Sequence, residues 1–223
     1  GGSESINSNK ALMACVSKAL KDNRVHEHMV QLIKTTDRSA VTHLLTKDHY
    51  IDVVIPRGGK GLIEKIVSCS KIPTIKHLDG NCHVYIDKTA NVKRAVNISL
   101  NSKTQRYGVC NAMETLLIHK SFPKKYVIKI LDEYRKNSVE IRGCNNLKKI
   151  SKNIVLAKNT DWFEEYLSPI IAIKIVDNID DAIKHIDKYG SSHTDAIVAS
   201  DKVAIDKFKR LVNSSSVMIN TST

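Results

Sequence analysis

The sequence predicts an α/β fold in which a largely parallel β-sheet is covered by helices. Two alternating patterns carry this prediction. Short runs of β-branched and other apolar residues are typical of strands buried on both faces, and longer segments place apolar residues at helical spacing. Their alternation along most of the 223 residues is typical of parallel strands joined by helices. With 42% apolar and 26% charged residues, the chain can bury a substantial core.

The first part of the chain is predicted to contain helices and one strand. Apolar residues at helical spacing predict a core-facing helix over Lys10–Leu20, and Asp37 can cap a short helix further along. Ile51–Ile55 is a β-branched run closed by Pro56, which suits a buried strand. The glycine-rich turn 58–61 then opens another helix, whose amino end can hold an anion.

After Pro73 the two patterns continue to the end of the sequence. Strands are expected at 82–86, 115–118, 153–157, 170–176, 195–199 and 217–220. Helices are expected at 91–102, 126–134 and 203–212, with one more capped at Asp180. Proline and glycine interrupt the pattern between Lys71 and Gly80, which predicts a boundary between residues 1–78 and residues 79–223.

The formal charge of +12 is the one unusual number in the composition. Phosphates dominate the affinity of basic proteins for nucleic acids, so a polyanion-binding module is one interpretation. The 27 lysines are scattered, however, and the chain has only 8 arginines and 5% aromatic residues. Nucleic-acid readers tend to concentrate arginine and, for single strands, aromatic side chains. We therefore expect a lysine-rich surface and no nucleic-acid partner.

Membrane insertion, secretion and metal binding are not indicated either. No run approaches the ~18 consecutive apolar residues of a membrane helix, and the first residues lack a basic region followed by an apolar stretch. The five cysteines are widely spaced and form no CxxC pair, so we expect neither a metal site nor a redox motif. Free cysteines fit a reducing, cytoplasmic location.

Cys110 is the cysteine best placed for chemistry. It lies in a polar loop between a predicted helix and a predicted strand, with Lys103 and Arg106 close in sequence. Neighbouring cations favour the thiolate, which is the nucleophilic form of cysteine. A free cysteine is nevertheless more often a small buried apolar side chain. The residues alone leave both interpretations open.

The loop belongs to a series of segments that point to one enzyme family. They are Ile55-Pro56-Arg57-Gly58-Gly59, Gly80 to Asp87, Lys103-Thr104-Gln105-Arg106, Cys110-Asn111, Glu114 to Leu117, Ser192 to Ile197, and Asn220 to Thr223. In this order, and over essentially the whole chain, they resemble the γ-glutamyl phosphate reductases, or glutamate-5-semialdehyde dehydrogenases, of the aldehyde dehydrogenase superfamily. The resemblance implies an aldehyde dehydrogenase-like fold, with an incomplete NADP-binding domain at 1–78 and a catalytic domain at 79–223.

The chemistry implied by the resemblance is reduction of an acyl phosphate through a thiol, a step of proline biosynthesis. The Cys110 thiolate would attack L-glutamyl 5-phosphate and expel phosphate, which leaves a thioester. NADPH would supply the hydride that gives L-glutamate 5-semialdehyde. The backbone N–H of Cys110 is a natural donor to the oxyanion that forms. The remaining cysteines, Cys15, Cys69, Cys82 and Cys144, are expected to be structural.

The resemblance also implies binding residues. Those expected for NADPH are Pro56, Arg57, Gly58, Gly59 and Glu165, and those expected for the substrate are Asn111, His193, Asp195, Asn220 and Ser222. Plainer roles fit the same residues: a turn that begins a helix at 56–59, a solvated acid at Glu165 and a surface histidine at His193.

Against the family pattern, the sequence resembles a fragment that lacks the N-terminal part and the C-terminal arm. Three interpretations follow: a reductase fragment that is inactive or weak by itself, a degenerate relative without catalysis, and an unrelated basic module for polyanions. The intact Cys110 loop favours the first over the third. The expected partners are a small-molecule substrate and, in a homo-oligomer, further copies of the chain.

Overall fold

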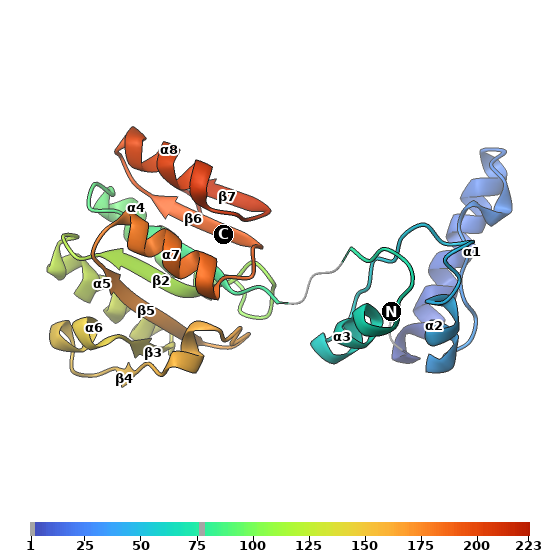
Figure 1. Cartoon of the computed structure of the whole chain (residues 1–223), viewed down its shortest axis with the longest axis horizontal. Helices are drawn as coiled ribbons and strands as arrows, with labels where there is room; N and C mark the ends of the chain where they lie inside the picture. Colours follow the sequence, from blue (N-terminus) through green and yellow to red (C-terminus); the bar gives the residue numbers. More distant parts are fainter. Residues whose placement is uncertain (1–2, 76–78) are drawn as a thin grey trace. The chain divides into compact units, whose positions relative to one another are not determined.

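The structure, a computed structural model, describes residues 3–75 and 79–223 (Figure 1). The chain divides into two compact units, Gly1–Leu78 and Asp79–Thr223. Each unit is described by itself below. Their assignment to a nucleotide-binding and a catalytic domain stays a prediction.

The first unit contains helices α1, Ile6–Asp22, α2, Arg38–Leu44, and α3, Lys60–Cys69, with single 3₁₀ turns at Ser3–Ser5 and Glu27–Met29. Asp37 caps α2 as predicted, because its carboxylate accepts a hydrogen bond of 2.8 Å from the N–H of Ser39. The glycine-rich turn also opens a helix as predicted, with Gly59 as the N-cap of α3.

Two predictions for the first unit are wrong. Ile51–Ile55 does not form a strand, and within residues 3–75 the only β-pairing is a single bridge between Val54 and Thr74. A strand needs a neighbour to receive its hydrogen bonds, and without one Ile55 is 61% exposed. Helix α1 forms but contributes no buried residue, so it does not face a core within its unit.

The second unit is built on a seven-stranded sheet in which every pairing is parallel, as the sequence predicted. Its order is β4-β3-β5-β2-β1-β6-β7. The strands are β1, Cys82–Ile86, β2, Met113–His119, β3, Glu140–Gly143, β4, Val155–Leu156, β5, Ile170–Val176, β6, Thr194–Val198, and β7, Ser216–Ile219.

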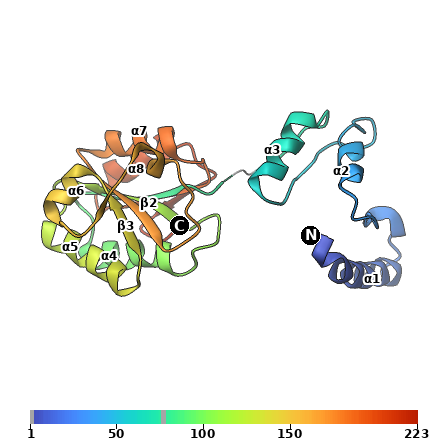
Figure 2. The ribbon, with the colours of Figure 1, turned by 90° about the horizontal axis from the view of Figure 1, so that it is seen from below.

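Helices cover both faces of this sheet (Figures 1 and 2). They are α4, Val92–Thr104, α5, Lys124–Lys136, α6, Asn145–Ile150, α7, Ile179–Tyr189, and α8, Lys202–Leu211, with a 3₁₀ turn at Asn159–Trp162. Side chains alternate along β1, so Val84 and Ile86 pack with the residues of α4 and α5 while Tyr85 packs with those of α7 and α8. The unit therefore has one hydrophobic core on each face of the sheet.

The sequence analysis missed β3 and α6 and misplaced one helix cap. In β3 the charged residues Glu140 and Arg142 alternate with buried ones, so the segment lacks the continuous apolar run that identified the other strands. The N-cap of α7 is Asn178, whose Oδ1 accepts from the N–H of Asp181 at 3.0 Å, whereas Asp180 lies in the first turn. All other elements expected after Pro73 form, with ends that differ by a few residues.

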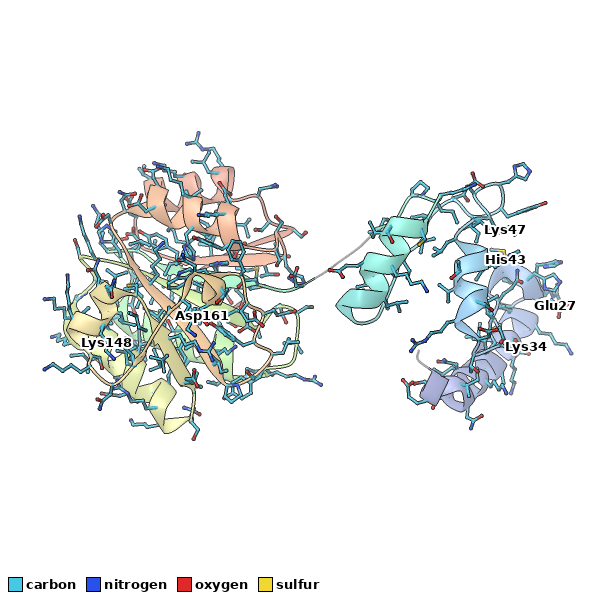
Figure 3. All side chains as sticks on the ribbon, turned by 60° about the horizontal axis from the view of Figure 1, so that its bottom comes forward. Glu27, Lys34, His43, Lys47, Lys148 and Asp161 are labelled. Carbon is cyan, nitrogen blue, oxygen red and sulfur yellow. The ribbon has the colours of Figure 1, made fainter. Side chains whose placement is uncertain are left out.

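Charged residues lie mostly at the surface, and the buried carboxylates among the described residues accept hydrogen bonds from within the chain. Asp161 is an example (Figure 3): it is 5% exposed and accepts from Arg142 Nη1 at 2.7 Å and from the N–H of Lys158 at 2.7 Å. Among the described helices, none has both the length and the apolarity needed to cross a membrane.

Truncation of a buried side chain in a central strand should lower the stability of the second unit. Leu117 of β2 is fully buried, so Leu117→Ala should lower the free energy of unfolding by about 2–5 kcal/mol. Trp162, the single tryptophan, is 7% exposed and reports unfolding of this unit by fluorescence in urea. Leu12→Ala, at a 65% exposed position of α1, is the control and should leave this transition in place; equal effects of the two variants would contradict the assigned core.

Candidate functional site

Cys110 is exposed in the loop that joins α4 to β2. The N–H of Ala112 donates to the carbonyl oxygen of Val109 at 3.0 Å, which makes Cys110 and Asn111 the central residues of a β-turn. No acceptor in the described ranges 3–75 and 79–223 bonds the backbone N–H of Cys110. The turn therefore combines an exposed cysteine with a backbone N–H that bonds no acceptor in those ranges.

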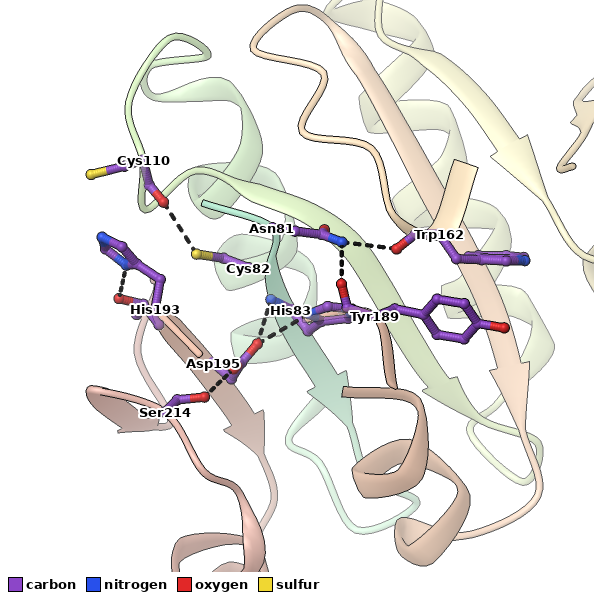
Figure 4. Close-up of polar contacts among 10 residues, drawn as sticks. Asn81, Cys82, His83, Cys110, Trp162, Tyr189, His193, Asp195 and Ser214 are labelled. Carbon is purple, nitrogen blue, oxygen red and sulfur yellow. Dashed lines mark hydrogen bonds and ion pairs between the residues drawn. The ribbon is translucent and has the colours of Figure 1, made fainter. Parts of the chain in front are cut away.

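The peptide of Cys110 is held by the segment that leads into β1. The Cys82 thiol donates to the carbonyl oxygen of Cys110 at 3.3 Å (Figure 4). Burial and the negative charge of Asp195 raise the pKa of Cys82 well above its usual range, so the thiol keeps the proton that it donates. A Cβ added to Gly80 would lie 1.8 Å from the same carbonyl oxygen, so this close approach requires glycine.

Glu165 contacts the same segment through the backbone of Gly80. Its Oε1 accepts from the N–H of Gly80 at 2.7 Å, and the side chain is half-buried. The carboxylate predicted to bind the cofactor thus lies one hydrogen bond from the glycine that packs on Cys110. This contact, between residues 85 positions apart, is absent from any sequence pattern.

Asn81 joins three of the segments that lead into strands. Its Nδ2 donates to the carbonyl oxygens of Trp162 and Tyr189, both at 2.8 Å (Figure 4). Trp162 precedes β5 and Tyr189 precedes β6, while Asn81 itself precedes β1. One amide therefore links the end of α7 and the end of the 3₁₀ turn to the segment that enters β1.

Lys103, named from the sequence as a neighbouring cation that favours the Cys110 thiolate, is instead paired with a carboxylate. It is fully buried at the end of α4, and its Nζ lies 2.5 Å from Oε2 of the equally buried Glu114. Burial is the main cause that lowers the pKa of Lys103 and raises the pKa of Glu114 to about 7. Because the ammonium is committed to Glu114, only Arg106 of the two predicted cations is exposed in the loop.

Two of the expected substrate residues lie at the Cys110 turn. Asn111 donates from Nδ2 to the carbonyl oxygen of Thr223 at 2.9 Å, which brings Ser222 and Thr223 beside the turn. Asn220 makes this possible. It has a φ of 55°, and its side-chain amide bonds both the N–H and the carbonyl oxygen of Ala199, at 3.1 and 2.9 Å. Asparagine tolerates this left-handed conformation better than most residues, and here it turns the chain at the end of β7.

His193 and Asp195, also expected to bind substrate, differ in position. Asp195 is 1% exposed and accepts from the N–H of His83 at 2.8 Å, from the His83 ring at 3.1 Å and from the Ser214 hydroxyl (Figure 4). Its carboxylate is thus occupied by the chain itself. His193 is half-buried, and its Nδ1 lies 2.7 Å from the Thr194 hydroxyl. Their contacts with substrate stay predictions.

The turn expected to bind NADPH lies in the first unit. Pro56 is buried, while Arg57, Gly58 and Gly59 are exposed before α3. The first turn of α3 carries no acidic residue, and a Cβ at Gly59 would meet nothing within 4 Å. An open, acid-free helix start of this kind fits a phosphate group.

Most of the candidate residues in the second unit precede strands. Gly80 leads into β1, Cys110 into β2, Glu165 into β5 and His193 into β6. Because every strand is parallel, these residues gather at the edge where the strands begin, which we call the amino edge. Ligands of open α/β sheets usually bind at the opposite, carboxyl edge. These candidate residues therefore lie at the edge that such ligands use less often.

The sequence analysis missed the residues that support Cys110. Gly80 and Cys82 fall within a segment of the family resemblance, but their contact with the Cys110 carbonyl joins positions far apart in the chain. Cys82 was expected to be structural only. No sequence signal pointed to Gly80 or Cys82 in this role. For the contact between Lys103 and Glu114, the one signal available was that they flank the loop with opposite charges.

Comparison with known proteins identifies relatives of the whole chain. The aldehyde dehydrogenase family model matches residues 6–143. The chain is 48% identical over all of its 223 residues to a γ-glutamyl phosphate reductase from Ruthia magnifica, of which it covers 53%. Among solved structures it is similar to the γ-glutamyl phosphate reductases of Thermotoga maritima (41% identity, TM-score 0.93, all of this chain and 54% of that one) and Saccharomyces cerevisiae (35%, 0.53, all of this chain and 56% of that one). The chain thus spans about half the length of these relatives, and the resemblance predicted from the motifs is confirmed.

A methyl group at position 80 should disturb the Cys110 turn. Gly80→Ala places a Cβ against the Cys110 carbonyl, so we expect the free energy of unfolding of the second unit to fall by about 1–3 kcal/mol. Gly108→Ala is the matched control in the same loop, because a Cβ there meets nothing within 4 Å. Urea unfolding followed by Trp162 fluorescence measures both; identical midpoints would show that the Gly80 approach is unimportant.

The buried His185 should make stability depend on pH. Burial, with His83, Lys174 and Lys188 nearby, lowers the pKa of His185 to about 2. The unfolded chain binds the proton near pH 6.5, so the free energy of unfolding is highest above that pH and falls by up to about 1.4 kcal/mol per unit as the pH drops. His185→Gln should flatten the slope between pH 6.5 and 4.5, whereas His49→Gln, in the first unit, should not. If His185→Gln left the slope unchanged, the pH dependence of stability could not be attributed to His185.

Proposed function

The chain belongs to the aldehyde dehydrogenase family, and on that premise we propose that it carries the catalytic cysteine of a γ-glutamyl phosphate reductase. The reaction is the NADPH-dependent reduction of L-glutamyl 5-phosphate to L-glutamate 5-semialdehyde in proline biosynthesis. The observation that supports it best is the exposed Cys110 turn, whose carbonyl is fixed by Gly80 and Cys82 while its thiol faces solvent.

The covalent step takes place at the Cys110 sulfur. The thiolate attacks the carbonyl carbon of the acyl phosphate, a C–S bond forms, and phosphate leaves with the electron pair of the C–O bond. NADPH, when bound, supplies a hydride to the resulting thioester. The tetrahedral alkoxide left on Cys110 would then reform its C=O bond as the C–S bond breaks, so that the aldehyde leaves and the thiolate is regenerated.

Each addition at the carbonyl carbon creates an oxyanion that needs a donor. The backbone N–H of Cys110 meets this need, because it lies next to the sulfur and bonds no acceptor in the described residues. The Cys82–Cys110 hydrogen bond supports this role, since it orients the following peptide of the same turn.

Binding residues for the substrate and the cofactor are part of the proposal. Asn111, His193, Asn220 and Ser222 would bind polar groups of the substrate. Asp195, whose carboxylate accepts from His83 and Ser214, would support them by linking β6 to β1 and to the segment before β7. Pro56, Arg57, Gly58, Gly59 and Glu165 would bind NADPH. The open helix start at Gly59 and the half-buried carboxylate of Glu165 are compatible with phosphate and ribose groups, respectively.

The proposal extends to the location and the assembly of the protein. A cytoplasmic location is supported by the five cysteines, all free in the described structure. Association with further copies of the chain is inferred from the family resemblance alone.

The proposed chemistry is tested by two readouts on the chain and on Cys110→Ala. The first is phosphate-dependent reduction of NADP⁺ with glutamate 5-semialdehyde, which needs the whole reaction. The second is a hydroxylamine-sensitive acyl adduct on Cys110 after incubation with an acyl phosphate, detected by mass spectrometry, which needs only the thiol. Both should fall by about 10³-fold or more in Cys110→Ala.

Cys15→Ala is the matched control, because Cys15 is also exposed but lies in α1. It should retain both readouts. An adduct without NADP⁺ reduction would support the nucleophile and restrict the chain to the first half-reaction. Absence of both would contradict the proposal and favour a relative that has lost catalysis.

A further inference from the structure

A buried ion pair closes the loop that carries Cys110. Lys103 lies in the last turn of α4 and Glu114 near the start of β2, so they stand at the two ends of the loop. Both side chains are 0% exposed, and Nζ lies 2.5 Å from Oε2. Nothing in the proposed reaction consumes either group.

The backbone at Glu114 departs from regular pairing. Cys82 pairs with Met113 and His83 pairs with Thr115, so Glu114 is an extra residue on β2, a β-bulge. Bulges redirect a side chain and are over-represented beside active sites. Here the bulge coincides with the residue that binds Lys103.

The same carboxylate reaches the segment that carries Glu165. Glu114 Oε1 accepts from the N–H of Leu167 at 3.3 Å, and Leu167 has a φ of 50°. The rings of Tyr107 and Tyr166, one from each segment, lie with their centroids 5.9 Å from the Lys103 ammonium. The ion pair therefore joins the Cys110 loop to the loop that precedes β5.

Stability alone explains such a pair poorly. Removing two charges from water costs several kcal/mol each, and buried ion pairs can often be replaced by apolar residues without loss of stability. A buried pair does fix geometry, because either charge alone would be strongly unfavourable. Because this pair lies between two candidate site loops, the geometry that it fixes is the position of those loops.

We propose that Lys103 and Glu114 are positioning residues, which hold the Cys110 turn and the Glu165 segment in the arrangement needed for acyl transfer. The inference rests on the proposed function, because it assigns the pair to the reactivity of Cys110. Neither residue touches the thiol. They act through the two loop ends and through Leu167.

The test compares Lys103→Met, Glu114→Gln and the double variant. Each single variant leaves one buried group without its partner, so both thermal stability and loop order should fall. The double variant carries no charge at either position, and the amide oxygen of the introduced glutamine can still accept from the N–H of Leu167. The thermal midpoint of the double variant should therefore recover. Its loop ends remain untied, however. Lys136→Met is the control, because Lys136 pairs with Glu133 at the surface.

Two measurements separate positioning from a structural role. The first is hydrogen exchange of the amides at 105–112 and 165–167, compared with those of β5. The second is the rate of Cys110 acylation by p-nitrophenyl acetate, corrected with Cys110→Ala. In the double variant we expect recovered stability, faster exchange confined to the two loops, and acylation about 10- to 100-fold slower than in the unmodified chain.

The outcomes are distinct. Recovery of acylation and loop protection together with stability would show a purely structural pair and overturn the inference, as would unchanged loop exchange in all three variants. Should the double variant fail to fold, Glu114→Asp, which keeps the charge but shortens its reach, supplies the same comparison. If the unmodified chain itself shows no acylation that depends on Cys110, the proposed function fails, and loop exchange alone decides whether the pair orders the two segments.

Discussion

Parallel pairing of β1 with β2 is the constraint on which the second unit depends. Parallel strands need a crossover, so α4 must run back across the sheet before β2 can begin, and the loop after α4 arrives beside the start of β1. The same rule brings the loops before β5 and β6 to that edge. Gly80, Cys110, Glu165 and His193 lie at one edge of the sheet for this reason, although they are scattered through more than a hundred residues.

Apolar and polar buried groups have different roles in the second unit. The two cores, one on each face of the sheet, contain the residues whose burial stabilises it. The buried polar groups concentrate at the amino edge instead: Asn81 bonds two carbonyl groups, Asp195 bonds His83 and Ser214, and Lys103 bonds Glu114. A buried polar group has few alternative hydrogen-bond partners, so these groups specify one conformation of the loops. Apolar contacts are less directional and would allow several conformations.

The accuracy of the sequence predictions varied with how local their signals were. Cys82–Ile86 and Ile170–Val176 were predicted with their observed bounds, because a short, mostly apolar run marks a strand buried on both faces. Ile51–Ile55 carries the same signal but finds no partner within residues 3–75, and β3 forms without the signal because β5 and β4 pair with it. Strand pairing depends on tertiary structure, so an apolar run indicates only a preference for the strand conformation.

The sequence by itself determined the α/β class, the parallel sheet, most of the elements of the second unit and, through the order of its motifs, the family and the likeness of Cys110 to its nucleophile. Only the tertiary structure decided what surrounds that cysteine. It placed Lys103, expected as a cation beside the Cys110 thiol, in a buried ion pair with Glu114, set Gly80 against the Cys110 carbonyl, and occupied Asp195 with His83. The reason is physical: a side chain's charge, burial and hydrogen bonds depend on groups that folding brings from distant positions, whereas patterning and propensity act within a few residues.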